Sequence, residues 1–174
     1  MKYFRIIFFL MLMSVMLTGC MGKAYDEGIE YLEAGDYDNA RNAFSEAIER
    51  KKNLADAYRG YAISCWEQED YEEALNGFKH AMEEGAEATS SMYGLMGNCA
   101  LKTGNYEEAI DYYAQGIVME GTSKELIQDM EFNMIAAYEG MGDLERAREK
   151  LAAYVEKYPE DEAALKEAEF LETR

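Results

Sequence analysis

The sequence has one proline, one histidine and one tryptophan in 174 residues. With a single proline and fourteen glycines, the chain does not have the composition of a loop-rich all-β fold. The histidine, His80, has no nucleophile or metal-ligand partner nearby in the sequence, so we expect it at the surface. No HExxH, EF-hand, P-loop, GxSxG or GxGxxG motif occurs. The sequence therefore predicts neither an enzyme nor a cofactor or metal site.

Basic residues are also scarce. The chain has 17 lysines and arginines against 35 acidic residues, a formal net charge of −18. Removing a leader that carries Lys2 and Arg5 would change this balance to −20. So acidic a surface repels phosphate backbones, which excludes direct nucleic-acid binding. A well-solvated helical surface explains the same charge without any special function.

Three cysteines are present, and two of them lie well inside the chain. Cys65 and Cys99 lie 34 residues apart, without a CxxC motif or a histidine cluster. Zinc binding and redox chemistry therefore have no support. A disulfide is the alternative, but exported disulfide scaffolds usually carry more cysteines, so we interpret both as small core residues.

The N-terminus has the layout of an export signal. Lys2 and Arg5 precede an apolar run at residues 6–17, which as a helix would be about 18 Å long, too short to span a hydrocarbon core of about 30 Å. The run ends in Leu17-Thr18-Gly19-Cys20, which resembles the lipobox of bacterial lipoproteins. The resemblance implies a signal peptide at 1–19 and a diacylglyceryl group, with acyl chains such as palmitate, on Cys20. The alternative is an ordinary signal peptide with an incidental cysteine.

Beyond the leader, one six-residue segment recurs four times. Its closing alanines lie 34, 35 and 38 residues apart. Each copy combines a helix end, often glycine, with an Asp or Asn that can cap the next helix. Asp70 with Glu73 and Asn105 with Glu108 resemble capping boxes, as does Thr122 with Glu125 before the fourth unit. The copies are Gly35-Asp-Tyr-Asp-Asn-Ala40, Glu69-Asp-Tyr-Glu-Glu-Ala74, Gly104-Asn-Tyr-Glu-Glu-Ala109 and Gly142-Asp-Leu-Glu-Arg-Ala147.

This period and these segments resemble the tetratricopeptide repeat, a helix-turn-helix unit of 34 residues. The resemblance implies an all-α fold, a right-handed α-solenoid of about four units with a C-terminal capping helix. Small residues such as Gly28 and Gly97 are expected at close helix contacts, and Phe44 and Tyr113 between units. Four extra residues precede the fourth unit, so its first helix should start one turn early.

The predicted boundaries follow from this register. The tether is 20–23, the repeat array is 24–159, its units are 24–54, 55–89, 90–127 and 128–159, and the cap is 160–174. In the cap, Ala164, Leu165, Ala168 and Leu171 are expected to face inward.

Family members place their ligands on a groove made by the first helix of each unit. On this chain the groove positions form an apolar and aromatic stripe interrupted by Arg59, Asn98 and Lys102. We expect aromatic anchors for an extended peptide or helix and cations for its carboxylate. For any single residue, packing between repeats, or pairing of a cation with a nearby acid, is the favoured explanation. For the groove as a whole, binding is favoured, because exposed apolar clusters usually mark contacts. The predicted partner-binding residues are Tyr25, Arg59, Ile63, Trp66, Asn98, Leu101, Lys102 and Phe132.

The sequence thus predicts a scaffold for a protein or peptide partner, lipid-anchored through Cys20 to the extracytoplasmic side of a membrane in the bacterial cell envelope. The alternative is an accessory factor for assembly of an envelope machine, such as a pilus or an outer-membrane insertion complex. Fold analogy supports protein binding without specifying the partner.

The lipid anchor generates the first testable prediction. Replacing the thiol in Cys20→Ser should leave the precursor unlipidated and move the protein out of the detergent phase, because no thioether can form. Intact-mass analysis of the membrane-derived wild-type protein checks the same point. An unmodified Cys20, or a mature protein that starts at another residue, contradicts the prediction.

Overall fold

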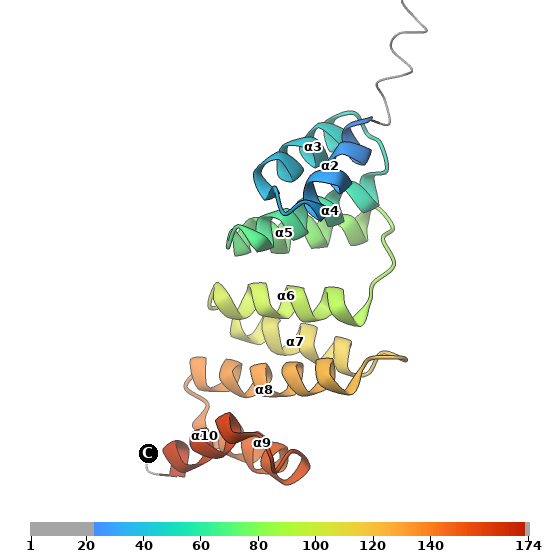
Figure 1. Cartoon of the computed structure of the whole chain (residues 1–174). Helices are drawn as coiled ribbons and strands as arrows, with labels where there is room; N and C mark the ends of the chain where they lie inside the picture. Colours follow the sequence, from blue (N-terminus) through green and yellow to red (C-terminus); the bar gives the residue numbers. More distant parts are fainter. Residues whose placement is uncertain (1–22, 173–174) are drawn as a thin grey trace, which may run out of the picture. The chain divides into compact units, whose positions relative to one another are not determined.

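The computed structural model describes residues 23–172, which fold into helices only (Figure 1). The predicted signal peptide and Cys20 lie outside the described residues. Within this range there are nine helices and no strand, so the predicted all-α class is confirmed. The helices are α2 (Lys23–Glu33), α3 (Tyr37–Glu49), α4 (Leu54–Glu67), α5 (Tyr71–Glu83), α6 (Ser90–Lys102), α7 (Tyr106–Ile117), α8 (Lys124–Gly140), α9 (Leu144–Lys157) and α10 (Glu162–Glu172).

The helices divide into two compact units, which are described separately. The N-terminal unit ends at Ala86 and contains α2 to α5, and the C-terminal unit begins at Glu87 and contains α6 to α10. In both units consecutive helices pack against each other. The first helices of neighbouring pairs also touch, α2 with α4 and α6 with α8, so each unit has a face made of first helices.

Short turns join the two helices of each pair. Gly35, Gly104 and Gly142 follow the first helices with φ angles of +74°, +78° and +75°, the left-handed conformation that glycine adopts without strain. Glu69 takes this place in the second pair with a φ of +60°. The turn geometry is therefore kept even where the sequence departs from glycine.

The predicted capping boxes were wrong in detail. Neither Asp70 nor Asn105 caps its helix through its side chain. The Asp70 carboxylate instead pairs with Arg41, 3.0 Å away, and the Asn105 amide donates to the hydroxyl of Thr103. A partner on another helix in the first case, and one within the same turn in the second, thus displaces the local cap.

The start of α8 differs from the prediction in the same way. Ser123 is the capping residue, and its hydroxyl accepts from the backbone N–H of Leu126 at 3.2 Å. The hydroxyl of Thr122 donates to the carbonyls of Gly116 and Met119, so it stabilises the preceding loop. The one-turn extension itself is confirmed, because α8 has 17 residues whereas α6 has 13.

Large rings from the second helices pack directly onto small residues of the first helices. Phe44 is fully buried over Gly28 and Gly60, and a Cβ placed on Gly60 would lie 2.4 Å from its ring. Tyr113 is fully buried over Gly97, where a Cβ would lie 2.5 Å from its ring. The predicted close helix contacts at Gly28 and Gly97 are confirmed.

The two internal cysteines behave as small apolar residues. Cys65 and Cys99 are fully buried in different units and carry free thiols. Burial raises the pKa of the Cys65 thiol to about 11, so it stays protonated at neutral pH. The core interpretation is confirmed.

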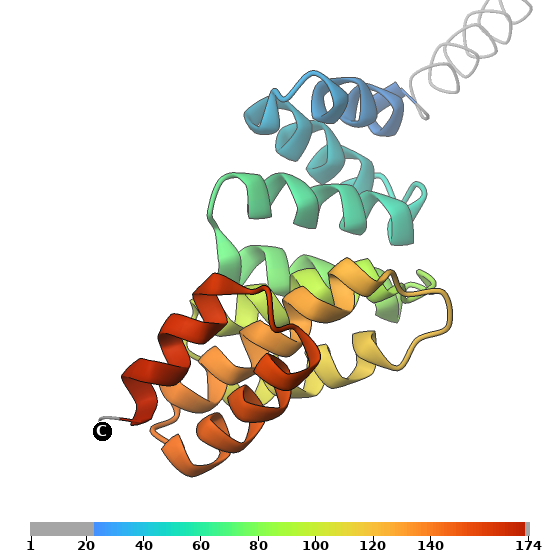
Figure 2. The ribbon, with the colours of Figure 1, turned by 60° about the horizontal axis from the view of Figure 1, so that its bottom comes forward.

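The last helix covers α9 only in part. Figure 2 shows α10 lying beside α9 at the end of the chain. Ala164 and Leu171 are buried as predicted, whereas Leu165 is 39% exposed and Phe170 is 46% exposed. The expectation that Leu165 faces inward was wrong, because the buried stripe of this helix is narrower than the apolar pattern of its sequence.

Two glycines of α6 provide a matched test of the ring contact. In Gly97→Ala the added methyl collides with the buried Tyr113 ring and should destabilise the fold by about 1–3 kcal/mol. In Gly94→Ala the methyl meets Leu126 at an ordinary 3.5 Å, and the better helix propensity should stabilise the fold by about 0.5–1 kcal/mol. Urea unfolding followed by circular dichroism measures both. Shifts in the same direction would contradict this account of the packing.

Candidate partner-binding faces

All the predicted partner-binding residues lie on first helices, but they are distributed over both units. In the N-terminal unit they are Tyr25 on α2 and Arg59, Ile63 and Trp66 on α4. In the C-terminal unit they are Asn98, Leu101 and Lys102 on α6 and Phe132 on α8. The structure therefore provides two candidate faces, the N-terminal face (α2 and α4) and the C-terminal face (α6 and α8).

Tyr25 belongs largely to the core of the N-terminal unit. It is half-buried, and its ring meets the edge of Phe44 at a centroid distance of 5.9 Å. Burial raises the pKa of its hydroxyl, and the nearby charges of Asp56 and Arg59 act on it with opposite signs. Tyr25 thus connects the core with the charged edge of α4.

The predicted ligand cation on this face already has a partner. Arg59 pairs with Asp56, one turn earlier on α4, at 2.5 Å, and the two side chains are 42% and 48% exposed. Exposed pairs of this kind contribute about 0–1 kcal/mol. The guanidinium could therefore exchange Asp56 for a ligand carboxylate at little cost.

Trp66 and Ile63 form the apolar part of the N-terminal face. Both are half-buried. The indole of Trp66 lies 5.2 Å from the ring of Tyr71, the first residue of α5, in a tilted arrangement. Contact with Tyr71 covers part of the indole and leaves the rest accessible, as an anchor for an apolar ligand group requires.

Asn98 is the centre of a hydrogen-bond network on the C-terminal face. Its Oδ1 accepts from the hydroxyl of Tyr113 at 2.7 Å and from Nδ2 of Asn133 at 3.0 Å. Among the described residues its Nδ2 has no hydrogen-bond partner, and no buried polar side-chain atom is left without one, so this amide is accessible. Asn133 was not among the predicted residues, although it follows Asn98 by 35 residues, about one repeat.

A pocket of about 270 Å³ opens between these amides and α10. The ring of Phe132 lies in its wall, 5.4 Å from Tyr154. The Tyr154 hydroxyl donates to Asp161 at 2.7 Å, and together with the backbone N–H of Ala164 it holds the pKa of Asp161 below its ordinary value. The pocket thus combines amide donors, an aromatic wall and an ionised carboxylate.

The other two predicted residues of this unit lie elsewhere. Leu101 is half-buried and Lys102 is exposed at the C-terminal end of α6. Neither lines the pocket that brings Asn98 and Phe132 together. Of the four residues predicted on the C-terminal face, the structure therefore brings only Asn98 and Phe132 to one pocket.

Between residues 23 and 172, no group of three or more His, Cys, Asp or Glu side chains could hold a metal ion. In this range, no helix combines the length and apolarity that crossing a membrane requires.

Family comparisons agree with the repeat geometry. Three models, each described as a tetratricopeptide repeat, match residues 25–79, 53–117 and 130–161, and together they cover most of the chain. The chain belongs to the tetratricopeptide repeat family. Tetratricopeptide repeats typically form non-catalytic scaffolds for protein interactions, and none of the three models describes an enzyme. No curated protein matches the sequence.

Solved structures with the same fold are distant in sequence. One is YrrB, described as a tetratricopeptide repeat protein with an unusual peptide-binding site, with a TM-score of 0.70 and 20% identity over 85% of this chain and 74% of YrrB. MamA from Desulfovibrio magneticus gives a TM-score of 0.72 and 18% identity over 88% of this chain and 84% of MamA. PilF from Pseudomonas aeruginosa gives 0.61 and 16% over 88% and 68%. At these identities the similarity shows the fold alone.

The contribution of the Tyr113–Asn98 hydrogen bond to folding stability can be measured without a ligand. Asn98→Ala leaves the buried Tyr113 without its acceptor and should cost about 1–3 kcal/mol. In a Tyr113→Phe background the hydroxyl is absent, so the same substitution should cost at least about 1 kcal/mol less. Urea unfolding of the four proteins gives the coupling energy. Simple additivity would show that the Tyr113–Asn98 bond contributes nothing to stability.

Proposed function

We propose that this chain is a lipid-anchored scaffold that binds an extended segment of a partner protein on its first-helix faces. The observation that carries the proposal is the pocket of about 270 Å³ on the C-terminal face, where Asn98, Asn133 and Phe132 meet. Its amides, aromatic ring and carboxylate suit a binding surface, in keeping with the scaffold role that is typical of tetratricopeptide repeats.

The amide pair suits a peptide backbone. An extended peptide presents alternating N–H and C=O groups, and an asparagine side chain can both donate to and accept from them. The accessible Nδ2 of Asn98 can donate to a ligand carbonyl without breaking the bonds that its Oδ1 already accepts. Phe132 offers an aromatic surface for a neighbouring apolar side chain.

The N-terminal face supplies complementary anchors. Trp66 and Ile63 offer apolar area, and Arg59 offers a cation held only by an exposed pair with Asp56. A partner with a carboxylate among apolar side chains fits these groups. YrrB, which has the same fold, is described as having a peptide-binding site, and this supports a peptide as the ligand class of the present chain.

The anchor is part of the same proposal. The lipobox-like Leu17-Thr18-Gly19-Cys20 supports lipidation of Cys20 after export, which would hold the domain on the extracytoplasmic side of a membrane in the cell envelope. Because α2 begins at Lys23, only two residues would separate the lipidated cysteine from the first helix. The first-helix faces would then act close to the membrane surface.

The alternative, an accessory factor for assembly of a pilus or an outer-membrane insertion complex, stays a prediction. PilF shares the fold at 16% identity, and similarity at this level does not favour one partner over another. The identity of a captured partner would distinguish the two functions.

Capture from detergent-solubilised membranes tests the proposal. Partner retained by the wild-type chain should be reduced at least about tenfold by Trp66→Ala and by Asn133→Ala, because each removes an anchor from a first-helix face. Co-purified protein is quantified by mass spectrometry, and the melting temperature of each variant is recorded on the same sample.

Two matched variants separate binding from packing. Tyr71→Ala removes the ring that contacts Trp66 but leaves the indole in place, because Tyr71 belongs to the second helix α5. Gln115→Ala removes an exposed amide from α7. Both should retain the partner. Equal losses for Trp66→Ala and Tyr71→Ala, or no loss for the two first-helix variants, would overturn the proposed site.

A further inference from the structure

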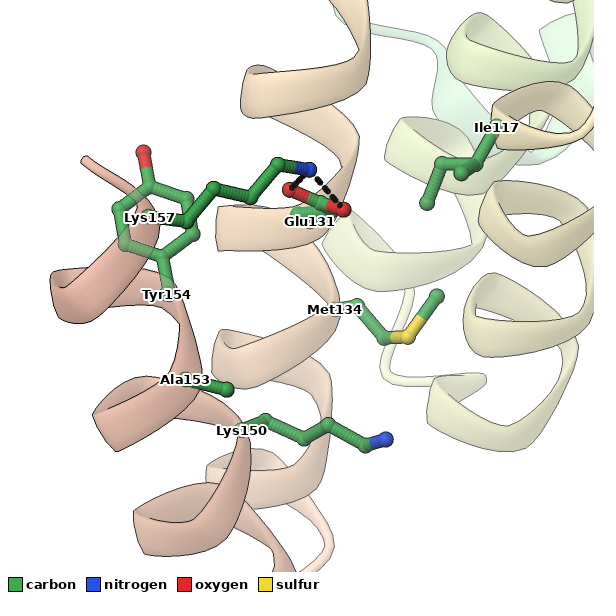
Figure 3. Close-up of a pocket in the computed structure, with 7 residues that line it drawn as sticks. All are labelled: Ile117, Glu131, Met134, Lys150, Ala153, Tyr154 and Lys157. Atoms are coloured by element: carbon green, nitrogen blue, oxygen red, sulfur yellow. Dashed lines mark hydrogen bonds and ion pairs between the residues drawn. The ribbon is translucent and has the colours of Figure 1, made fainter.

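A second pocket, of about 260 Å³, lies in the C-terminal unit between α9 and the helices α7 and α8 (Figure 3). It shares Tyr154 with the pocket of the C-terminal face, but most of its lining comes from the second helices α7 and α9. The predicted partner-binding residues do not line it. Apart from the shared Tyr154, the two pockets are lined by different residues.

One side of the pocket is apolar. Ile117 at the end of α7 and Met134 on α8 are half-buried and face Ala153 across the opening. Val118, which follows Ile117 directly, is 81% exposed. An exposed valine beside two half-buried apolar side chains leaves hydrophobic surface that an apolar ligand group would cover.

The two lysines of the pocket, Lys150 and Lys157, lie two turns apart on α9. Near its end, Lys157 donates to both carboxylate oxygens of Glu131 at 2.8 Å, and the hydroxyl of Tyr158 donates to the same carboxylate at 3.0 Å. Lys150 lies two turns earlier, about 10 Å along the helix axis. In Figure 3 its ammonium group reaches into the space beside Met134.

Lys150 has no ion pair or hydrogen bond with another described residue, although acidic residues outnumber basic ones two to one in the chain. Arg146, one turn earlier, is paired with Asp143 at 3.3 Å and brings no carboxylate to the exposed Lys150. The helix α9 as a whole carries four basic and three acidic residues. The pocket thus combines an apolar wall with an exposed ammonium group that pairs with none of the described residues.

We propose that this pocket binds the C-terminal residue of a peptide whose last side chain is apolar. Its carboxylate pairs with Lys150, and its side chain packs on Ile117, Met134 and Ala153. A volume of about 260 Å³ accommodates one large apolar side chain.

Glu131 favours a peptide over a simple fatty acid. Its carboxylate has acceptor sites beyond those used by Lys157 and Tyr158, and a peptide provides backbone N–H groups on the side away from its terminal carboxylate. A fatty acid would also pair with Lys150, but it would place its apolar tail against the charged pair of Glu131 and Lys157.

Methyl NMR spectra of the full chain test the proposal, with N-acetyl-Gly-Leu as the probe and its C-terminal amide as the matched control. The free acid should shift the methyl resonances of Met134 and Ile117, whereas the amide should bind at least about tenfold more weakly.

Met134→Leu assigns the methionine resonance. Lys150→Gln should weaken binding of the acid about tenfold, the value of one charge-assisted hydrogen bond. Lys124→Gln, which makes the same charge change on an exposed lysine of α8, should leave the affinity unchanged.

Several outcomes would overturn the proposal. Equal affinity for the acid and the amide would remove Lys150 as a carboxylate partner, and equal effects of Lys150→Gln and Lys124→Gln would reduce its role to net charge. Stronger binding of octanoate than of the peptide would assign the pocket to a fatty acid. Absence of methyl shifts with every probe would leave it without a ligand of this class.

Discussion

The packing of a large ring against a residue without a side chain is the constraint on which the rest of the fold depends. Phe44 over Gly28 and Gly60, and Tyr113 over Gly97, bring first and second helices closer than any Cβ would allow. This close approach aligns the first helices of each unit as neighbours, α2 beside α4 and α6 beside α8. The candidate faces exist because of that alignment. Tyr113 links the helix packing to the C-terminal face directly, since its buried ring packs on Gly97 and its hydroxyl donates to Asn98.

The repeat period was sufficient to predict the helices, because each unit buries residues of the same kind at the same spacing. Phe44, Phe78 and Tyr113 are all fully or almost fully buried, as is Ala74 between them. Helix ends were less predictable, because capping is a competition between nearby partners. Asp70 is drawn to Arg41 of another helix pair, and the spacing of residues along the chain does not show which pairs come into reach.

The candidate site was predicted by position rather than by interaction. Family register places Asn98 and Phe132 on the same face, and the structure brings them to one pocket. The register does not show that Arg59 is paired with Asp56, or that Asn133 bonds to Asn98. The pocket around Lys150 is built from three helices of two neighbouring repeats, so no single motif indicates it. Such features arise from side chains that meet only after folding.

The length of α8 has a consequence for how such a chain can evolve. The loops before α6 and α8 span residues 84–89 and 118–123, so the four additional residues between the third and fourth alanines are contained in the helix itself. Four residues add about 400° of helical rotation, which returns the following side chains to within about 40° of their original direction. An insertion of this size keeps Ile135 and Ala137 in the core, whereas one of two residues would turn them toward solvent. Natural variation in the length of these helices is therefore expected to occur in steps of three or four residues, with single insertions confined to loops.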